Sequence, residues 1–257
     1  MPAVAGVRTC GPGAPGRGAF SLVMRGAFPY TLPCMQIQIL PSLLAADLGR
    51  LGDELRRTEA SGADAVHLDV MDAHFVPNLS YGPDVVALSR ATVPGLYRHV
   101  HLMMTRPDRY VDAFAAAGAQ TIQVHVEADA DVHATIAQIA AAGAKPAIVL
   151  NPETPAHAAA PYIGETDEIL VMTVHPGRGG QKFIEECLPK IAAVRRMAGD
   201  GATVMVDGGV NASTAALAAA AGANAFVAGS YLFGRGDMKA AVAELRETCR
   251  KSHAAEA

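Results

Sequence analysis

Residues 60–72 read ASGADAVHLDVMD, where a Gly-Ala dipeptide stands between a helical pattern and a short run with β-branched residues. The same arrangement recurs along the chain, with Gly-Ala dipeptides that begin at Gly62, Gly118, Gly143, Gly201 and Gly222. Glycine is favoured just past a helix end because it adopts the left-handed backbone conformation found there. The spacings are close to one or two lengths of a strand followed by a helix. The sequence therefore predicts alternating strands and helices.

The repeat divides the chain into eight predicted strands and eight predicted helices. The strands are expected at 36–40, 65–70, 98–103, 121–126, 147–150, 168–174, 203–206 and 225–229. The helices are expected at 48–61, 84–91, 107–117, 132–142, 155–162, 185–198, 213–221 and 238–251, with Pro107 in a first turn and Ser213 as an N-cap. Such alternation requires a parallel sheet with right-handed crossovers.

The number and length of these units favour an α/β fold of the (β/α)8 TIM-barrel class. A doubly wound open sheet is the alternative, and the absence of a nucleotide-binding fingerprint in a strand–helix context counts against it. The glycine pattern GPGAPG at 11–16 is no such fingerprint, because neither a strand nor a helix flanks it and its prolines lack N–H groups.

Composition indicates one α/β domain. The chain has 257 residues, 51% of them hydrophobic and 18% charged, which excludes disordered, collagen-like and coiled-coil proteins. The chain has a formal net charge of −4, whereas nucleic-acid-binding proteins usually carry an excess of basic residues. The four cysteines form no CxxC pair, as expected of a reduced, cytoplasmic protein. The uncharged stretch between Asp207 and Arg235 contains glycine and asparagine, so we expect no membrane span.

Residues 1–34 differ from the remainder. They contain three arginines and no acidic residue, are crowded with Gly and Pro, and show no periodicity. We expect a disordered or non-native N-terminal extension there, with a targeting segment as the alternative. Residues 35–257 are then expected to form a single barrel domain.

Polar residues mark the carboxyl ends of three predicted strands. Because side chains alternate along a strand, His67 and Asp69 share one face of the second strand. His101 lies on the third strand and Asp207 follows the seventh. Active sites of such barrels lie at these strand ends. If the polar faces point inward, the four side chains converge near the barrel mouth.

These four groups predict a metal site. A lone strand histidine is more often a hydrogen-bonded core residue, and a lone strand-terminal aspartate often caps the next helix. Two imidazoles and two carboxylates in one apolar layer, however, would cost several kcal/mol per charge without a compensating cation. The donor set suits one divalent ion, Zn²⁺, Fe²⁺, Mn²⁺ or Co²⁺, and does not choose among them.

Glycines follow the last three predicted strands. They are Gly177, Gly179 and Gly180 after the sixth, Gly208 and Gly209 after the seventh, and Gly229, next to Ser230, after the eighth. Glycine lets backbone N–H groups approach an oxyanion. Each pair alone is compatible with a tight turn, but together at adjacent strand ends they predict a phosphate site. Metal and phosphate together imply a small phosphorylated substrate.

Six segments, in this order, resemble the ribulose-phosphate 3-epimerase family. They are ILPSLLAADL (39–48), VHLDVMDAHFVPN (66–78), VHLMMTRP (100–107), VMTVHPGRGGQKF (171–183), VDGGVN (206–211) and VAGSYLFG (227–234). The resemblance implies a metal-dependent 3-epimerase that interconverts D-ribulose 5-phosphate and D-xylulose 5-phosphate. It also implies a (β/α)8 barrel.

By these motifs, the resemblance implies that His67, Asp69, His101 and Asp207 hold the metal. Asp69 and Asp207 would be the catalytic acid–base pair, one for each face of C3, with a metal-stabilised enediolate between the two proton transfers. Substrate contacts would come from Ser42, Met71, His101, Met103, Met172, Gly177, Arg178, Gly179, Gly180, Asp207, Gly208, Gly209, Gly229 and Ser230. Gln123 and His125 are expected to line the interior behind these groups.

The chain departs from the family's usual sequence at three positions. His99 stands where the family usually has Asp, Ala73 replaces a Gly, and Arg178 replaces a Phe in the substrate loop. We expect His99 to change a hydrogen bond behind the ligands, and Arg178 to affect substrate binding or preference.

Two alternatives therefore stay open: a 3-epimerase of a six-carbon phosphoketose such as allulose 6-phosphate, and a non-catalytic phosphosugar-binding barrel. The expected partners are a small phosphorylated ketose and further copies of the chain, with no nucleic acid and no membrane.

Overall fold

Eight parallel strands form one sheet in the computed structural model, which describes residues 36–254. They are β1 (Gln38–Pro41), β2 (Ala65–Met71), β3 (Tyr97–Met103), β4 (Thr121–His125), β5 (Lys145–Leu150), β6 (Glu168–Met172), β7 (Thr203–Asp207) and β8 (Ala225–Ala228). Their order is β1-β8-β7-β6-β5-β4-β3-β2. A parallel bridge from Ser42, just beyond β1, to His67 in β2 joins the two ends of the sheet. The predicted barrel is confirmed.

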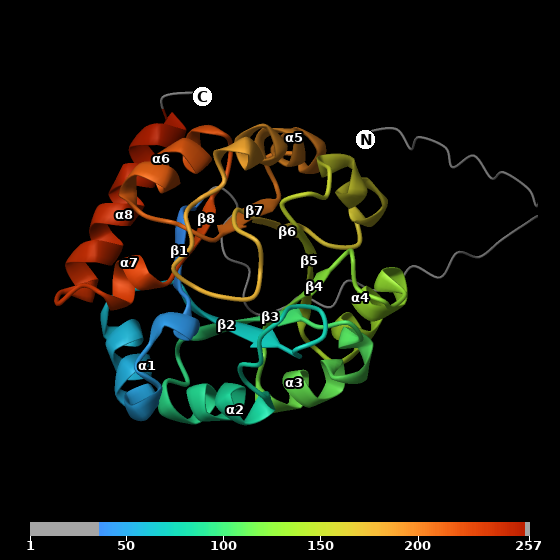
Figure 1. The fold of residues 1–257 in the computed structure, drawn as a ribbon, viewed down its shortest axis with the longest axis horizontal. Coiled ribbons are helices and arrows are strands. Elements are labelled where there is room, and N and C mark those ends of the chain that lie inside the picture. The colour runs from blue at the N-terminus through green and yellow to red at the C-terminus, as the bar shows by residue number, and fades with distance from the viewer. Residues whose placement is uncertain (1–35, 255–257) are drawn as a thin grey trace, which may run out of the picture. The chain divides into compact units, whose positions relative to one another are not determined.

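Helices surround the strands on the outside (Figure 1). The α-helices are α1 (Leu51–Ala60), α2 (Pro83–Thr92), α3 (Val111–Ala117), α4 (Val132–Ala141), α5 (Leu188–Ala198), α6 (Ala212–Ala220), α7 (Ser230–Phe233) and α8 (Met238–Ala254). Short 3-10 helices are η1 (Leu43–Ala45), η2 (Leu48–Arg50), η3 (Pro107–Arg109), η4 (Ala156–Tyr162) and η5 (Glu185–Cys187). Within the described part of the chain, no helix is both long and apolar enough to cross a membrane.

Several predicted elements differ in detail from the observed ones. The helix predicted at 155–162 is the 3-10 helix η4, in which Pro161 lacks the N–H that an α-helix would use. The predicted N-cap Ser213 is wrong: Asn211 caps α6, and its side chain accepts hydrogen bonds from the Ser213 and Thr214 N–H groups. Helix α7 was not predicted. Pro107 does begin η3, and the predicted extension at 1–34 lies outside the described residues.

The alternation of β2 sorts its side chains between two cores. Val66, Leu68 and Val70 pack in the apolar layer between the sheet and the helices. Ala65 belongs instead to a second apolar cluster with Leu170, Met172 and Met205, which come from facing strands of the barrel. Because His67 and Asp69 follow Ala65 at intervals of two, they also point into the barrel.

The helices bury apolar side chains in the layer outside the sheet. Leu55 in α1 is fully buried, whereas Leu217 in α6 is 43% exposed. We expect Leu55→Ala to lower the free energy of unfolding by about 2–5 kcal/mol, because it removes packed atoms and leaves a cavity. The matched change Leu217→Ala should lower it by less than about 1 kcal/mol. Urea unfolding followed by circular dichroism measures both, and equal losses would contradict this core assignment.

Candidate active site

Four polar side chains meet at the carboxyl end of the barrel. His67 and Asp69 come from β2, His101 from β3 and Asp207 from the end of β7, and one ligand atom of each lies within 4.8 Å of the others. The imidazole Nδ1 atoms of His67 and His101 lie 3.3 and 3.2 Å from Asp69 Oδ1. His101 Nδ1 is also 3.8 Å from Asp207 Oδ2. The predicted convergence of these groups is thus present.

The cluster has the properties of a cation site. His67, Asp69 and His101 are buried. Within residues 36–254, the buried Nδ1 atom of His67 has no hydrogen-bond partner. A buried nitrogen without a partner is unfavourable unless a ligand or ion satisfies it. Two imidazole nitrogens and two carboxylates are donors that borderline first-row divalent metals accept. The residues present therefore fit the predicted metal.

Each imidazole has a polar partner behind it. His67 Nε2 lies 2.9 Å from Gln123 Oε1, and His101 Nε2 lies 2.9 Å from His125 Nε2. His125 Nδ1 is in turn 3.1 Å from Glu127 Oε2. Gln123 and His125 thus line the interior behind the cluster, as predicted. Both imidazoles turn their Nδ1 atoms toward the carboxylates and their Nε2 atoms away.

The two carboxylates have opposite electrostatic environments. Burial raises the pKa of Asp69, but the charge of His67 and the hydrogen bond from His101 outweigh it and hold the pKa well below its usual range. Burial, followed by repulsion from Asp69, raises the pKa of Asp207. Ser42 Oγ also donates a 2.5 Å hydrogen bond to Asp69 Oδ2. One carboxylate is therefore held ionised while its neighbour retains a proton more readily.

A pocket opens from the cluster to the surface. Its wall contains the predicted contact residues Ser42, Met71, Met103, Met172, Gly177, Arg178, Gly179, Gly180, Asp207, Gly208, Gly209, Gly229 and Ser230. His101 is the exception, because it is fully buried beside Asp69 and does not line the pocket. The sequence analysis missed seven residues of the wall, which are Leu44, Ala45, Val174, Pro176, Gln181, Val210 and Val227. The apolar ones resemble core residues in a sequence, and only their place within the matched segments marks them.

Two glycines after β7 are required by the backbone. Gly208 and Gly209 have φ angles of +116° and +66°, which side chains larger than hydrogen rarely tolerate. A Cβ at Gly209 would lie 2.3 Å from the Phe183 backbone nitrogen. The close approach packs the loop after β7 against the segment that follows β6. The glycine loops of three adjacent strands therefore share one wall of the pocket.

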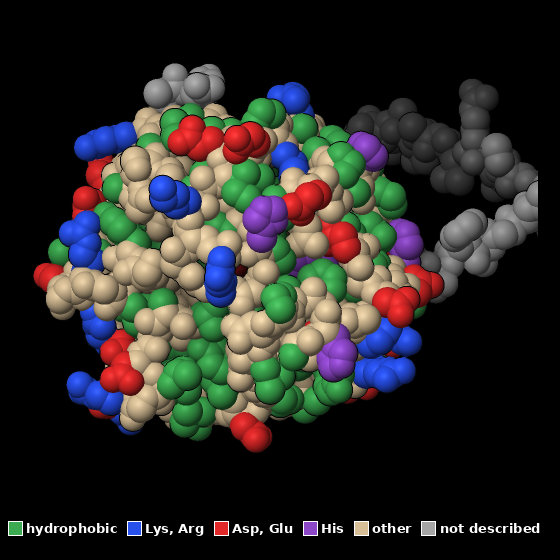
Figure 2. Space-filling view, in the orientation of Figure 1, with side chains coloured by type: hydrophobic (Ala, Val, Ile, Leu, Met, Phe, Trp, Pro, Cys, Tyr) green, Lys and Arg blue, Asp and Glu red, His purple; other side chains and the backbone are tan. Residues whose placement is uncertain are grey.

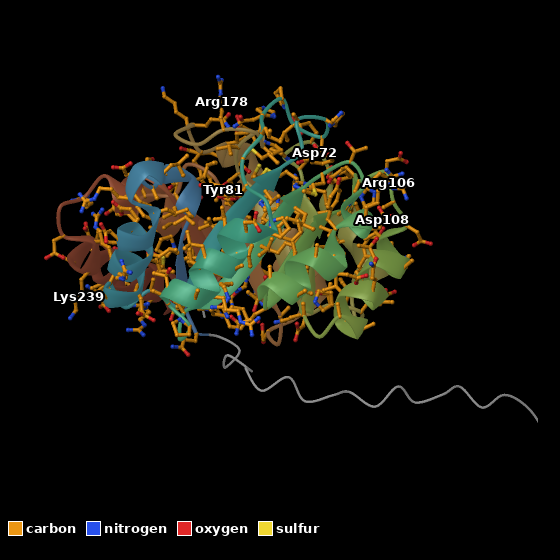
Figure 3. The ribbon with its side chains drawn as sticks, turned by 90° about the horizontal axis from the view of Figure 1, so that it is seen from below. Asp72, Tyr81, Arg106, Asp108, Arg178 and Lys239 are labelled. Carbon is orange, nitrogen blue, oxygen red and sulfur yellow. The ribbon has the colours of Figure 1, made fainter. Side chains whose placement is uncertain are left out.

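Two loops meet over the barrel mouth. The Asn78 side-chain amide, in the loop after β2, donates a 2.8 Å hydrogen bond to the Gly177 carbonyl in the loop after β6. Ala73, which replaces a family glycine, has φ +61° and is therefore strained. Arg178 and Asp72 both stand at this end of the barrel (Figure 3).

The mouth has no concentrated positive charge. Acidic, basic and histidine side chains are interspersed over this face (Figure 2). The exposed guanidinium of Arg178 makes no hydrogen bond or ion pair with residues 36–254. Below the mouth, His99 pairs with His67 across β2 and β3. Its Nδ1 lies 3.2 Å from Glu168 Oε1.

Solved structures share the fold at low sequence identity. KGPDC from Streptococcus mutans aligns with a TM-score of 0.62 at 15% identity, over 84% of this chain and 99% of that one. The 3-hexulose-6-phosphate synthase from Salmonella typhimurium aligns with a TM-score of 0.63 at 17% identity, over 84% and 100%. These similarities confirm the barrel architecture.

Curated relatives are much more similar. Ribulose-phosphate 3-epimerase of Bacillus subtilis (strain 168) is 48% identical over 214 residues, which cover 82% of this chain and 98% of the relative. The protein of the same name from Escherichia coli (strain K12) is 44% identical over 222 residues, covering 85% and 99%. The model of the ribulose-phosphate 3 epimerase family matches residues 38–233, from the first strand to the end of α7. With its barrel and its cluster of polar groups at the mouth, this chain belongs to the ribulose-phosphate 3 epimerase family.

Proposed function

We propose that this barrel is a metal-dependent 3-epimerase that interconverts D-ribulose 5-phosphate and D-xylulose 5-phosphate. One observation carries the proposal: Asp69 and Asp207 come from different strands to a single point, together with two imidazoles. The names of the curated relatives support the substrate pair. The glycine loops along the pocket wall support a phosphorylated ligand.

His67, Asp69, His101 and Asp207 would hold the divalent ion, with Zn²⁺, Fe²⁺, Mn²⁺ and Co²⁺ all compatible with the donors. When bound, such an ion supplies Lewis-acid stabilisation of the negative charge that develops on neighbouring sugar oxygens. Ser42, hydrogen-bonded to Asp69, orients that carboxylate. The histidines are held by their partners on β4.

The two aspartates divide the proton transfer between them. Epimerisation removes the C3 proton from one face of the sugar and returns a proton to the other face. Asp69 is on β2 and Asp207 on β7, with β1 and β8 between them in the closed sheet, so the carboxylates can flank a planar enediolate. Their pKa values are displaced in opposite directions, which suits one base and one acid. Each turnover exchanges the two protonation states.

The remaining pocket residues bind and shield the substrate. Met71, Met103 and Met172 place apolar side chains in the pocket wall, where they exclude water from the reacting carbon. Gly177, Gly179 and Gly180 and the glycines after β7 and β8 offer backbone N–H groups to a phosphate. Arg178 adds a positive charge at the rim. A cytoplasmic location, a homo-oligomeric state and the absence of nucleic-acid partners stay predictions.

The acid–base roles predict a shared requirement for both carboxylates. We expect Asp69→Asn and Asp207→Asn each to lower kcat for ribulose 5-phosphate by at least about 100-fold, because the two groups act in series. The control Asp108→Asn alters an aspartate that pairs with Arg106 away from the pocket (Figure 3). It should leave kcat unchanged. Turnover close to wild type in either site variant would contradict the two-base assignment.

Proton exchange at C3 also predicts isotope uptake. One carboxylate takes the substrate proton and the other delivers a proton. Both exchange their protons with solvent between turnovers. In heavy water, we expect each converted sugar to carry deuterium at C3, as measured by NMR of the product. Products that keep their original C3 hydrogen would instead indicate direct transfer by a single shielded group.

Metal dependence predicts a reversible loss of activity. Removing the ion with a chelator should abolish epimerisation and lower the unfolding temperature, because the uncompensated carboxylates then destabilise the native state. Restoring one equivalent of a competent divalent metal should recover both properties. Full activity in protein shown by elemental analysis to hold no transition metal would overturn the proposed function.

A further inference from the structure

A buried carboxylate lies deeper in the barrel than the metal-site cluster. Glu168, at the start of β6, is 2% exposed. Its Oε1 accepts a 3.0 Å hydrogen bond from the Gln123 amide nitrogen. Its Oε2 lies 3.7 Å from Lys145 Nζ, and His99 Nδ1 is 3.2 Å from Oε1. None of the proposed catalytic steps uses Glu168.

Glu168 can only accept hydrogen bonds when it is ionised. Burial raises the pKa of Glu168, but the neighbouring His99 and Lys145 and the Gln123 hydrogen bond outweigh it and lower the pKa to about 2. An ionised carboxylate has no proton to donate. The Gln123 side chain must therefore turn its NH₂ group toward Glu168 and its carbonyl oxygen the opposite way.

The carbonyl oxygen of Gln123, which points away from Glu168, determines which nitrogen of His67 carries a proton. Gln123 Oε1 lies 2.9 Å from His67 Nε2, and an amide carbonyl only accepts. His67 must consequently carry a hydrogen on Nε2. That leaves Nδ1, which is buried and lacks a hydrogen-bond partner within the described residues, as the nitrogen that faces Asp69.

We propose that Glu168 is a positioning residue for His67, acting through the amide of Gln123 to hold the histidine in the form whose Nδ1 binds metal. This inference rests on the proposed metal site. The second imidazole has a parallel arrangement, since His101 Nε2 faces His125, and His125 Nδ1 faces the carboxylate of Glu127. Outer partners of this kind set the orientation and the protonated nitrogen of metal-binding histidines.

A purely structural role for Glu168 makes a different prediction. If the carboxylate only balances the charge of Lys145, its loss will lower stability without changing metal binding. Lys145 keeps a second carboxylate, Asp167, at 3.0 Å, so Glu168→Gln is expected to fold. The amide introduced by this substitution would offer both a donor and an acceptor, which frees the Gln123 amide to turn and releases the constraint on His67.

The test measures zinc affinity by competition with a chromophoric chelator. We expect E168Q to bind zinc about 10- to 100-fold more weakly than the wild type. The control E165Q removes a surface carboxylate that pairs with His133, and should bind zinc as the wild type does. In parallel, ¹H–¹⁵N NMR of the zinc-loaded proteins reports the protonated nitrogen of His67. It should be Nε2 in the wild type, with that signal weakened or exchanging in E168Q.

An exchanged pair distinguishes orientation from charge balance. In Q123E/E168Q, the carboxylate at position 123 accepts from His67 Nε2, while the amide at position 168 donates to that carboxylate. The order of acceptor and donor toward His67 is restored, so we expect zinc affinity within about threefold of the wild type. A folded exchanged protein that binds zinc at least tenfold more weakly would overturn the proposal.

The remaining outcomes separate this inference from the proposed function. A wild-type protein that binds no metal refutes both the metal site and the role of Glu168. A wild type that binds zinc while E168Q binds it equally well, with His67 unchanged in the NMR spectrum, overturns only the role of Glu168. Should E168Q fail to fold, the zinc affinity of Q123E/E168Q and the NMR spectrum of wild-type His67 test the role of Glu168 in its place. A proton on Nδ1 of wild-type His67 also overturns the proposal.

Discussion

Two carboxylates and two imidazoles in an apolar barrel mouth need a positive charge at their centre. His67, Asp69 and His101 are almost completely removed from solvent, and burial alone would make their charged forms unfavourable. The same requirement appears in the electrostatics of the cluster: burial lowers the pKa of His67, but the charge of Asp69 outweighs it and raises the pKa to about 9, and the pKa of Asp207 is raised as well. A divalent ion meets this requirement.

The register of the strands brings the four charged or polar side chains of the cluster to one point. Asp69 pairs with His101 across β2 and β3, so their side chains enter the barrel at the same level. Asp207 pairs with Met172 across β6 and β7, which places one acidic and one apolar group side by side on the opposite wall. The bridge between Ser42 and His67 closes the sheet next to the cluster. A shift of one residue in any of these pairings would turn a ligand toward the helices.

Much of this arrangement could be predicted from the sequence because strand periodicity is a local property. The alternation in AVHLDVM, residues 65–71, is enough to place His67 and Asp69 on the inner face. Features that depend on exact hydrogen-bond geometry were harder to predict. The sequence pattern predicted Ser213 as the cap of α6, whereas the extended backbone at Asn211 places the Asn211 side chain over the first turn. Glu168 was missed because a glutamate at the start of a strand resembles a solvated end. Its burial depends on Gln123, His99 and Lys145 from three other strands.

The central claim is that one cation occupies the point between these four side chains. Anomalous diffraction from a crystal of the metal-loaded protein, recorded at the absorption edge of the bound element, tests it most directly. We expect one strong peak at about 2.0–2.2 Å from the Nδ1 atoms of His67 and His101 and from a carboxylate oxygen of Asp69 and of Asp207. A peak elsewhere on the barrel, or coordination through the Nε2 atoms, would contradict it.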